Sequence, residues 1–115
     1  MSLWAGDMRE TFHIKRNLGP DSTNPDPRLR MVERYGPAEP HPCRWQPGAR
    51  LVKAADGRQV VSEGTLFTTA RFTSKDLLWL PGEDPEDVGA SKRALRAWER
   101  KALETGDFDH TEAAL

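Results

Sequence analysis

Proline placement limits the folds open to this 115-residue chain more than any other feature. Proline has no N–H to donate and a fixed φ, so it is excluded from helix interiors and central strands. Seven of the nine prolines lie in one part of the chain, at positions 20, 25, 27, 37, 40, 42 and 47. Their density predicts that residues 17–42 form a long Pro-rich connection. Connections longer than about 12–15 residues are usually functional or disordered.

β-prone stretches occupy much of the first 80 residues. Apolar and polar residues alternate from Phe12 to Lys15, which is the period of a half-buried strand. Asp56-Gly57 between two β-prone runs predicts a hairpin, because both turn positions favour positive φ. Gly64 is expected to mark a bulge or kink. The expected strands are 11–16, 43–46, 50–54, 58–62, 65–70 and 76–80, and their close spacing predicts a small barrel or sandwich.

The last third of the chain has a different character. Good helix formers fill residues 91–104, and Leu95, Trp98 and Ala102 fall at helical spacing. This stretch predicts a short C-terminal helix. The whole chain, 1–115, is expected to be a single domain that begins with an N-terminal arm of residues 1–10.

Composition excludes several classes of protein. No run of about 18 apolar residues is present, which argues against a membrane span. The first seven residues lack the basic-then-apolar pattern of a secretory leader. A single cysteine excludes an internal disulfide and a cysteine-based zinc site. So short a chain is expected to have a thin core.

Charge is balanced overall but unevenly distributed. The net charge is −1, which argues against nucleic-acid binding driven by bulk charge. Residues 36–80 carry six basic and four acidic side chains, whereas residues 81–115 carry five and nine. The middle of the chain is therefore mildly basic and the end acidic, although a single charge run is most often only a solvated face.

No arrangement of residues predicts catalysis, a metal or a cofactor. The three histidines, His13, His41 and His110, match no zinc spacing. Asp109 and His110 form the core of the one local cluster, but adjacent strand residues point to opposite faces. No serine lies in a nucleophile elbow, and the glycines are scattered. Cys43 is either a small buried hydrophobe or a thiolate of lowered pKa. The expectation is a non-enzymatic protein.

Aromatic residues leave two interpretations open. Basic side chains and aromatics interleave in the middle of the chain, as in barrels that bind single-stranded nucleic acid, although such aromatics are more often core. Four tryptophans are many for this length. Some of them can lie at a subunit interface, where Trp is enriched. The interface candidates are Trp4, Tyr35 and Trp98.

From Glu33 onward, the order of several short motifs resembles a known family. Gln46-Pro47 ends one expected strand, and a polar hairpin follows it. Next come a Thr-Leu-Phe strand at 65–67, an Asp-x-apolar-Pro-Gly strand at 76–82 and a closing His-x-Glu-x-x-Leu strand at 110–115. This set resembles the head–tail stopper proteins of long-tailed bacteriophages, also called head-closure or head-completion proteins. Each motif is short, so the order of the set carries the resemblance.

The resemblance implies a small antiparallel β-barrel that forms a ring in the virion neck. A hexamer is the implied stoichiometry, and a dodecamer is the competitor. The implied partners are the portal or adaptor ring, a tail terminator or tail tube, and double-stranded DNA bound without sequence specificity. Such a protein is found in the virion, and in the host cytoplasm during assembly. A protruding loop, here 48–59, would face the channel with Arg50, Lys53, Asp56 and Arg58.

The helical character of 91–104 departs from the family, which usually has a strand there. Three other interpretations of the function stay open beside the stopper. Two are other neck rings, an adaptor or a tail terminator. The third is a small oligonucleotide-binding β-barrel, whose binding to single strands would weaken with added salt.

Overall fold

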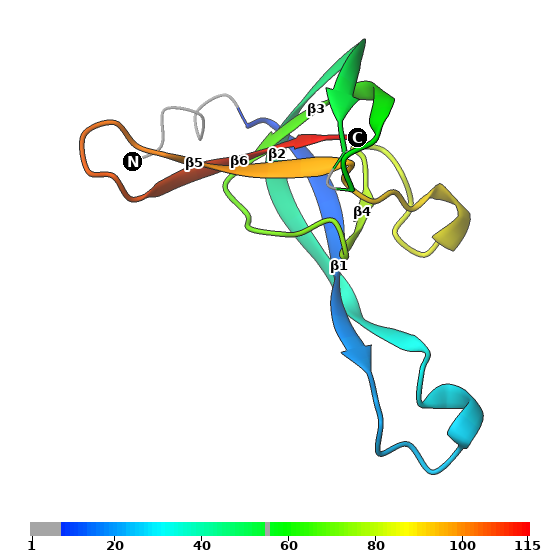
Figure 1. The fold of residues 1–115 in the computed structure, drawn as a ribbon. Helices are drawn as coiled ribbons and strands as arrows, with labels where there is room; N and C mark the ends of the chain where they lie inside the picture. Colours follow the sequence, from blue (N-terminus) through cyan, green and yellow to red (C-terminus); the bar gives the residue numbers. More distant parts are fainter. Residues whose placement is uncertain (1–7, 55) are drawn as a thin grey trace.

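A computed structural model describes residues 8–54 and 56–115, which form one six-stranded antiparallel sheet (Figure 1). The spatial order is β4-β1-β2-β3-β6-β5. The prediction of a mainly β, antiparallel domain is confirmed. The strands are β1 (Glu10–Pro20), β2 (Glu33–Lys53), β3 (Gln59–Thr68), β4 (Leu77–Trp79), β5 (Arg96–Lys101) and β6 (Phe108–Ala114), with short 3-10 helices η2 (Pro27–Leu29) and η3 (Val88–Ala90).

The core lies on one face of the curled sheet and is small. Phe12 and Ile14 of β1 are fully buried, as their alternation predicts, together with Leu66 and Leu78. Phe72 closes the cluster by meeting the Phe12 ring edge-on, with 6.0 Å between centroids. Most of the remaining core side chains are alanines or the thiol of a cysteine, so the apolar area buried per residue is modest.

The sheet is not closed into a barrel. Its outer strands, β4 and β5, are not neighbours in the strand order. Instead, Leu78 and Lys92 form an isolated bridge, exchanging two backbone hydrogen bonds of 2.8 Å. β4 is only three residues long, and Pro81, which follows soon after it, has no N–H to donate to a ladder. β4 therefore does not extend far enough to pair with β5 and close the predicted barrel. The result is a curled, open sheet.

Most of the predicted Pro-rich connection is strand, so the prediction for 17–42 is wrong. β1 continues to Pro20 and β2 begins at Glu33, which leaves only 21–32 as the connection. Over 33–42, β2 pairs with β1 alone. Pro40 and Pro42 are two residues apart, so both nitrogens can face the open side of β2, where no N–H is needed. Prolines are tolerated here because this part of β2 is an edge.

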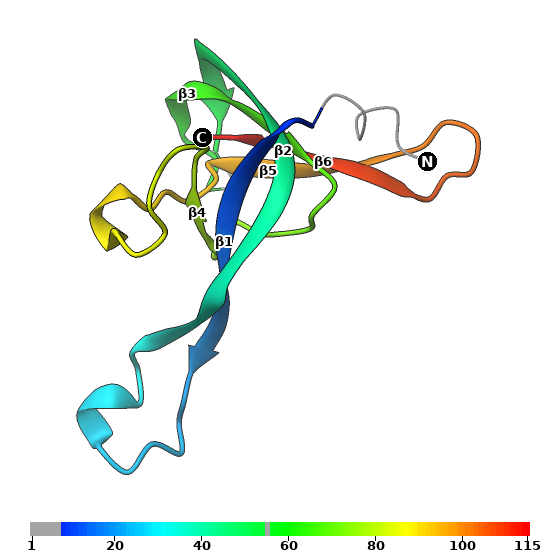
Figure 2. The same cartoon turned by 180° about the vertical axis from the view of Figure 1, so that it is seen from behind.

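The two strands therefore leave the body as a twisted ribbon, the β1–β2 arm (residues 17–36), which ends at η2. Both views show the arm projecting away from the rest of the sheet (Figures 1 and 2). The Cα radius of gyration is 15.5 Å, against about 13 Å for a compact domain of this length. The longest dimension is 49 Å, whereas the other two are 30 and 29 Å.

The predicted helix at 91–104 is also wrong, because residues 96–101 form β5. β5 pairs with β6, placing Ala97 opposite Ala113 and Trp98 opposite Glu112. Ala97 packs against the core, while Trp98 lies on the other face. Here the ladder with β6 and the contact of Ala97 with the core outweigh an intrinsic helix propensity of a few tenths of a kcal/mol per residue.

The predicted hairpin at 48–59 is present as the end of β2 and the start of β3. Its turn carries Gly57 at φ 90°, and Ala54 N–H donates to Arg58 O at 2.8 Å. The expected irregularity near Gly64 lies in the partner strand, where the register shifts between Pro47 and Arg50. Of the predicted N-terminal arm, residues 1–7 lie outside the described residues, and Met8 is buried.

Gly64 provides a test of the close packing between β2 and β3. A Cβ at this position would lie 2.6 Å from the Trp45 ring and 2.7 Å from Gln46 O. We expect Gly64→Ala to lower the free energy of unfolding by about 1–3 kcal/mol, because a backbone oxygen must move. Gly36→Ala is the matched control, since its nearest atom lies 3.9 Å away. Urea denaturation of both variants measures the difference, and equal stabilities would contradict the packing.

Candidate assembly interface

Exposed apolar side chains gather on the β1–β2 arm. Leu18, Leu29, Met31 and Val32 are 57%, 47%, 84% and 51% exposed. The η2 helix at the tip has no buried residue. Apolar side chains on a projecting ribbon without a core of their own make the arm the candidate interaction surface of this chain.

Local polar contacts order the tip of the arm. Asp21 accepts hydrogen bonds from the backbone N–H and the hydroxyl of Thr23, at 3.0 and 2.6 Å. Asp26 caps η2 by accepting from Arg28 N–H at 3.0 Å, and it also pairs with the Arg28 guanidinium at 3.2 Å. These contacts hold the pKa of both carboxyls below their ordinary value. Hydrogen bonds within the turns therefore order the backbone of the tip, whereas its apolar side chains stay exposed.

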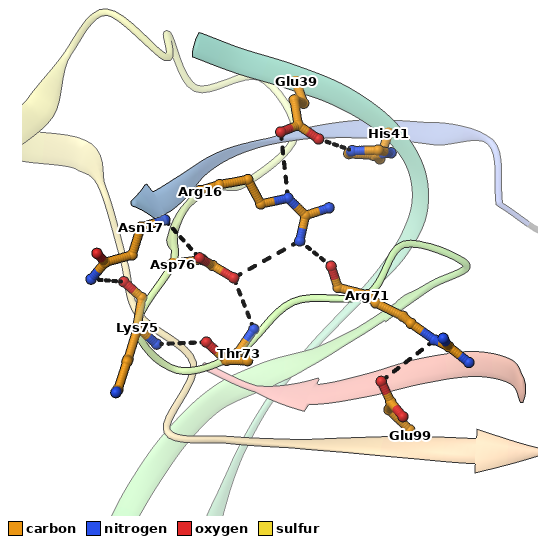
Figure 3. Close-up of polar contacts among 9 residues, drawn as sticks. All are labelled: Arg16, Asn17, Glu39, His41, Arg71, Thr73, Lys75, Asp76 and Glu99. Atoms are coloured by element: carbon orange, nitrogen blue, oxygen red, sulfur yellow. Dashed lines mark hydrogen bonds and ion pairs between the residues drawn. The ribbon is translucent and has the colours of Figure 1, made fainter. Parts of the chain in front are cut away.

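Arg16 connects the base of the arm to the body (Figure 3). Its guanidinium donates to the carbonyl oxygen of Arg71 and lies 3.9 Å from the Asp76 carboxylate. Its Nε lies 3.4 Å from Glu39 on β2. One side chain thus joins both strands of the arm to the loop between β3 and β4.

Asp76 completes this joint. Its side chain is buried and accepts hydrogen bonds from the backbone N–H groups of Asn17, at 2.8 Å, and Thr73, at 2.9 Å (Figure 3). The side-chain amide of Asn17 in turn donates to the Glu33 carboxylate at 2.9 Å. Because the bonds run from Asp76 to backbone atoms of both segments, they fix the direction in which the arm leaves the sheet.

Tyr35 lies half-buried at the base of the arm. Its hydroxyl donates to Glu33 at 3.2 Å and accepts from Arg93 at 2.8 Å. Tyr35 therefore braces the arm against the segment that precedes β5. This role is internal to the subunit and does not depend on a partner.

The four candidates on the β2–β3 hairpin separate into two groups. The Asp56 carboxylate accepts a hydrogen bond from the Arg58 backbone N–H at 3.1 Å and pairs with the Arg58 guanidinium at 2.7 Å, and these contacts lower the pKa of Asp56. Arg50 and Lys53 are exposed and have no ion-pair partner within the described ranges. Between them, Leu51 lies opposite Val61, and the two are 63% and 66% exposed. The hairpin thus carries an exposed apolar pair on the same face as Lys53, with Arg50 on the opposite face of β2.

Trp98, another predicted interface residue, is half-buried on the outer face of β5. The guanidinium carbons of Arg96 and Arg100 lie 5.3 and 5.8 Å from its ring centroid. Arg100 also pairs with Glu112 of β6 at 3.4 Å. This face combines an aromatic ring with cations, which suits contact with an anionic or aromatic partner. Trp4 lies outside the described residues.

His110 is buried between the carboxylates of Asp109 and Glu112, although adjacent strand residues were expected to point to opposite faces. Its Nδ1 lies 2.8 Å from Asp109, and its Nε2 lies 3.1 Å from Glu112. Because opposite ring nitrogens are used, the three groups do not converge on one point. Within 8–54 and 56–115, no group of three or more His, Cys, Asp or Glu residues is arranged to hold a metal ion.

Cys43 is fully buried, and desolvation raises the pKa of its thiol to about 12. Of the two interpretations of this residue, the small buried hydrophobe is correct. The thiol is neutral at any physiological pH and is no nucleophile.

Sequence reasoning missed the apolar tip and the joint at Asp76. The tip had a signal, since apolar residues stand inside the charged run 28–34. The joint had none, because Arg16 and Asp76 are 60 positions apart and meet only through the β1–β4 ladder.

Comparison with protein-family models, curated proteins and solved structures finds no match for this chain. No helix among the described residues is long and apolar enough to cross a bilayer. The interpretation of the interface therefore depends on its geometry and on the order of motifs along the chain.

The Glu39 carboxylate makes the joint sensitive to acid. The hydrogen bond with His41, at 3.1 Å, and the nearby Arg16 lower the pKa of Glu39 below its ordinary value of 4.5. The stabilisation is therefore complete above about pH 4.5 and is lost as the pH falls toward the lowered pKa. We expect Glu39→Gln to flatten the decline of unfolding free energy below about pH 4.5.

Urea denaturation over that pH range measures the effect. Glu104→Gln, in the exposed β5–β6 turn, is the matched control and should keep the wild-type slope. An unchanged slope in Glu39→Gln would show that the joint does not couple to folding.

Proposed function

We propose that this chain is a ring-forming head–tail stopper, a structural protein of the virion neck in a tailed bacteriophage. The observation that carries the proposal is the rigidly anchored β1–β2 arm with its four exposed apolar side chains. The motif order from Glu33 to Leu115 supports the same class of protein. An assembly subunit needs such a surface, whereas an isolated small domain gains nothing from exposing it.

The arm suits docking through side chains rather than through strand addition. β1 ends in the arm at Pro20, and β2 carries Pro37, Pro40 and Pro42 directly after the base of the arm. Prolines on an edge prevent a neighbouring strand from extending the sheet. Specificity then depends on the apolar tip, which buries its side chains only when a partner is present.

Assembly also fits the modest core. Burial of a partner surface adds stability that a thin core lacks, since a ligand that binds only the folded state favours that state. A ring of identical subunits in the neck would provide such a partner on both sides of each copy. We favour a hexamer, with a dodecamer as the competing stoichiometry, and a place between the portal or adaptor ring and the tail.

The β2–β3 hairpin suits contact with DNA in the channel. Arg50 and Lys53 are exposed and without ion-pair partners in the described chain, so their charges are available to phosphates. Phosphate contacts need no particular base sequence. The modest charge is suited to DNA that must later move past the hairpin.

A second candidate is binding of single-stranded nucleic acid on the outer face of β5. Trp98 between Arg96 and Arg100 favours it, because bases stack on aromatic rings and guanidinium planes. Fluorescence titration with an oligonucleotide at low salt distinguishes the two. Quenching of tryptophan fluorescence that disappears with added salt supports this candidate, and the absence of binding removes it.

Imaging of virions tests the stopper directly. In particles made by the phage or prophage that encodes this chain, antibody labelling should mark the neck alone. Deleting the gene should leave DNA-filled heads that leak and do not join tails. Virions that lack the protein, or intact tailed particles after deletion, would overturn the proposal.

Charge reversal in the hairpin tests its role in DNA retention. We expect the double variant Arg50→Glu, Lys53→Glu to assemble normally but to lose packaged DNA from filled heads several-fold more often, since like charges repel phosphate. The single variant Asp56→Lys, which breaks the ion pair with Arg58 on the same turn, is the control for loss of hairpin structure. The test is the amount of DNA per tailless head, measured for the wild type and both variants. Equal DNA retention in the double variant and the wild type would contradict a role of the hairpin in the channel.

A further inference from the structure

Every exposed large hydrophobic side chain of the described residues lies on one of four projections. They are Leu18, Leu29, Met31 and Val32 on the arm, Leu51 and Val61 on the β2–β3 hairpin, Val88 in the loop after β4, and Leu103 in the β5–β6 turn. The projections differ in charge. This difference indicates which of them can meet.

Residues 28–34 of the arm and the loop after β4 have opposite net charge. The basic strip, residues 28–34, contains three arginines and one glutamate around Leu29, Met31 and Val32. The acidic loop, residues 83–88, contains four carboxylates, no cation and the 67% exposed Val88. Each segment therefore combines an exposed apolar centre with a net charge of one sign, and in the basic strip Arg28 is paired with Asp26 at 3.2 Å.

The acidic loop is a preformed surface. The Trp79 indole N–H donates to Asp87 O at 2.8 Å, and Lys92 pairs with Glu83 at 2.9 Å. Asp87 also caps η3 by accepting from Gly89 N–H. Glu86 and Val88 remain exposed on this anchored loop, with no ion pair for Glu86 in the described chain. Little ordering is needed for a partner to bind there.

The basic strip does not reach the acidic loop of its own subunit. Asp76 and Arg16 fix the arm at its base, and Arg93 holds Tyr35 there at 2.8 Å. Both ribbon views show the tip, in cyan, well apart from the loop, in yellow (Figures 1 and 2). A contact between the two surfaces must therefore join different subunits.

We infer that the basic strip of one copy docks on the acidic loop of a second copy. This inference rests on the proposed ring, and it names the surfaces that build it. Because the two surfaces differ, the contact is heterologous and can repeat around a closed ring. The β5–β6 turn is the weaker receptor, since it offers two carboxylates, Glu104 and Asp107, beside Lys101.

Disulfide trapping in the full chain tests which surfaces meet. Met31→Cys and Val88→Cys place one thiol in each surface, and the buried Cys43 thiol adds no background. Under mild oxidation we expect the double variant to form covalent oligomers at least about tenfold faster than the control pair Met31→Cys, Leu103→Cys. Equal rates for the two pairs would overturn the inference, as would no crosslinked species at any protein concentration.

Charge exchange gives a second readout. Arg30→Glu alone and Glu86→Arg alone should each slow crosslinking about tenfold, and the combined variant should restore it, because the pair is re-formed between copies. Circular dichroism and thermal melting confirm that each variant is folded. Failure of the combined variant to restore crosslinking would overturn the docking, whereas failure of the neck function itself appears separately as absence from virions.

Discussion

The carboxylate of Asp76 is the group on which the shape of the molecule most depends. It accepts the backbone N–H groups of Asn17 and Thr73 and lies beside Arg16, so it joins the departing arm to the loop below it. A two-stranded ribbon is only marginally stable by itself. The buried, charge-assisted hydrogen bonds at its base convert the ribbon into a fixed projection, and a fixed projection can present the same surface to a partner each time.

A fixed arm explains how a small subunit with a thin core can be suited to assembly. The apolar side chains that the body cannot accommodate lie at the ends of projections, where neighbouring subunits can cover them. In the docking that we infer, opposite net charge on residues 28–34 and on the loop after β4 distinguishes projections that are otherwise alike. Prolines along the arm edges oppose uncontrolled strand pairing, so contact is limited to side chains at the tip.

Local patterns were reliable where they matched the pairing that formed. The alternation at Phe12 and the Asp56-Gly57 turn correctly located β1 and the β2–β3 hairpin, because these signals act over a few residues. The prolines misled because their cost depends on which side of a strand is paired, and β2 is an edge over 33–42. Likewise, the helix propensity of 91–104 is weaker than the ladder with β6. Arg50 and Lys53 are exposed cations, as the sequence suggested, whereas the hydrogen bonds of Tyr35 to Glu33 and Arg93 depend on segments far apart in the chain.

The sequence by itself determined the mainly β class, the hairpin turn and the positions of exposed charge, since each depends on residues close together in the chain. Only the tertiary structure decided that the Pro-rich region is a rigid arm and that the sheet stays open. Arg16, Glu39 and Asp76 are far apart in sequence and meet only when β1, β2 and β4 pair. Contacts of this kind depend on strand register, and register is set by the packing of the whole sheet.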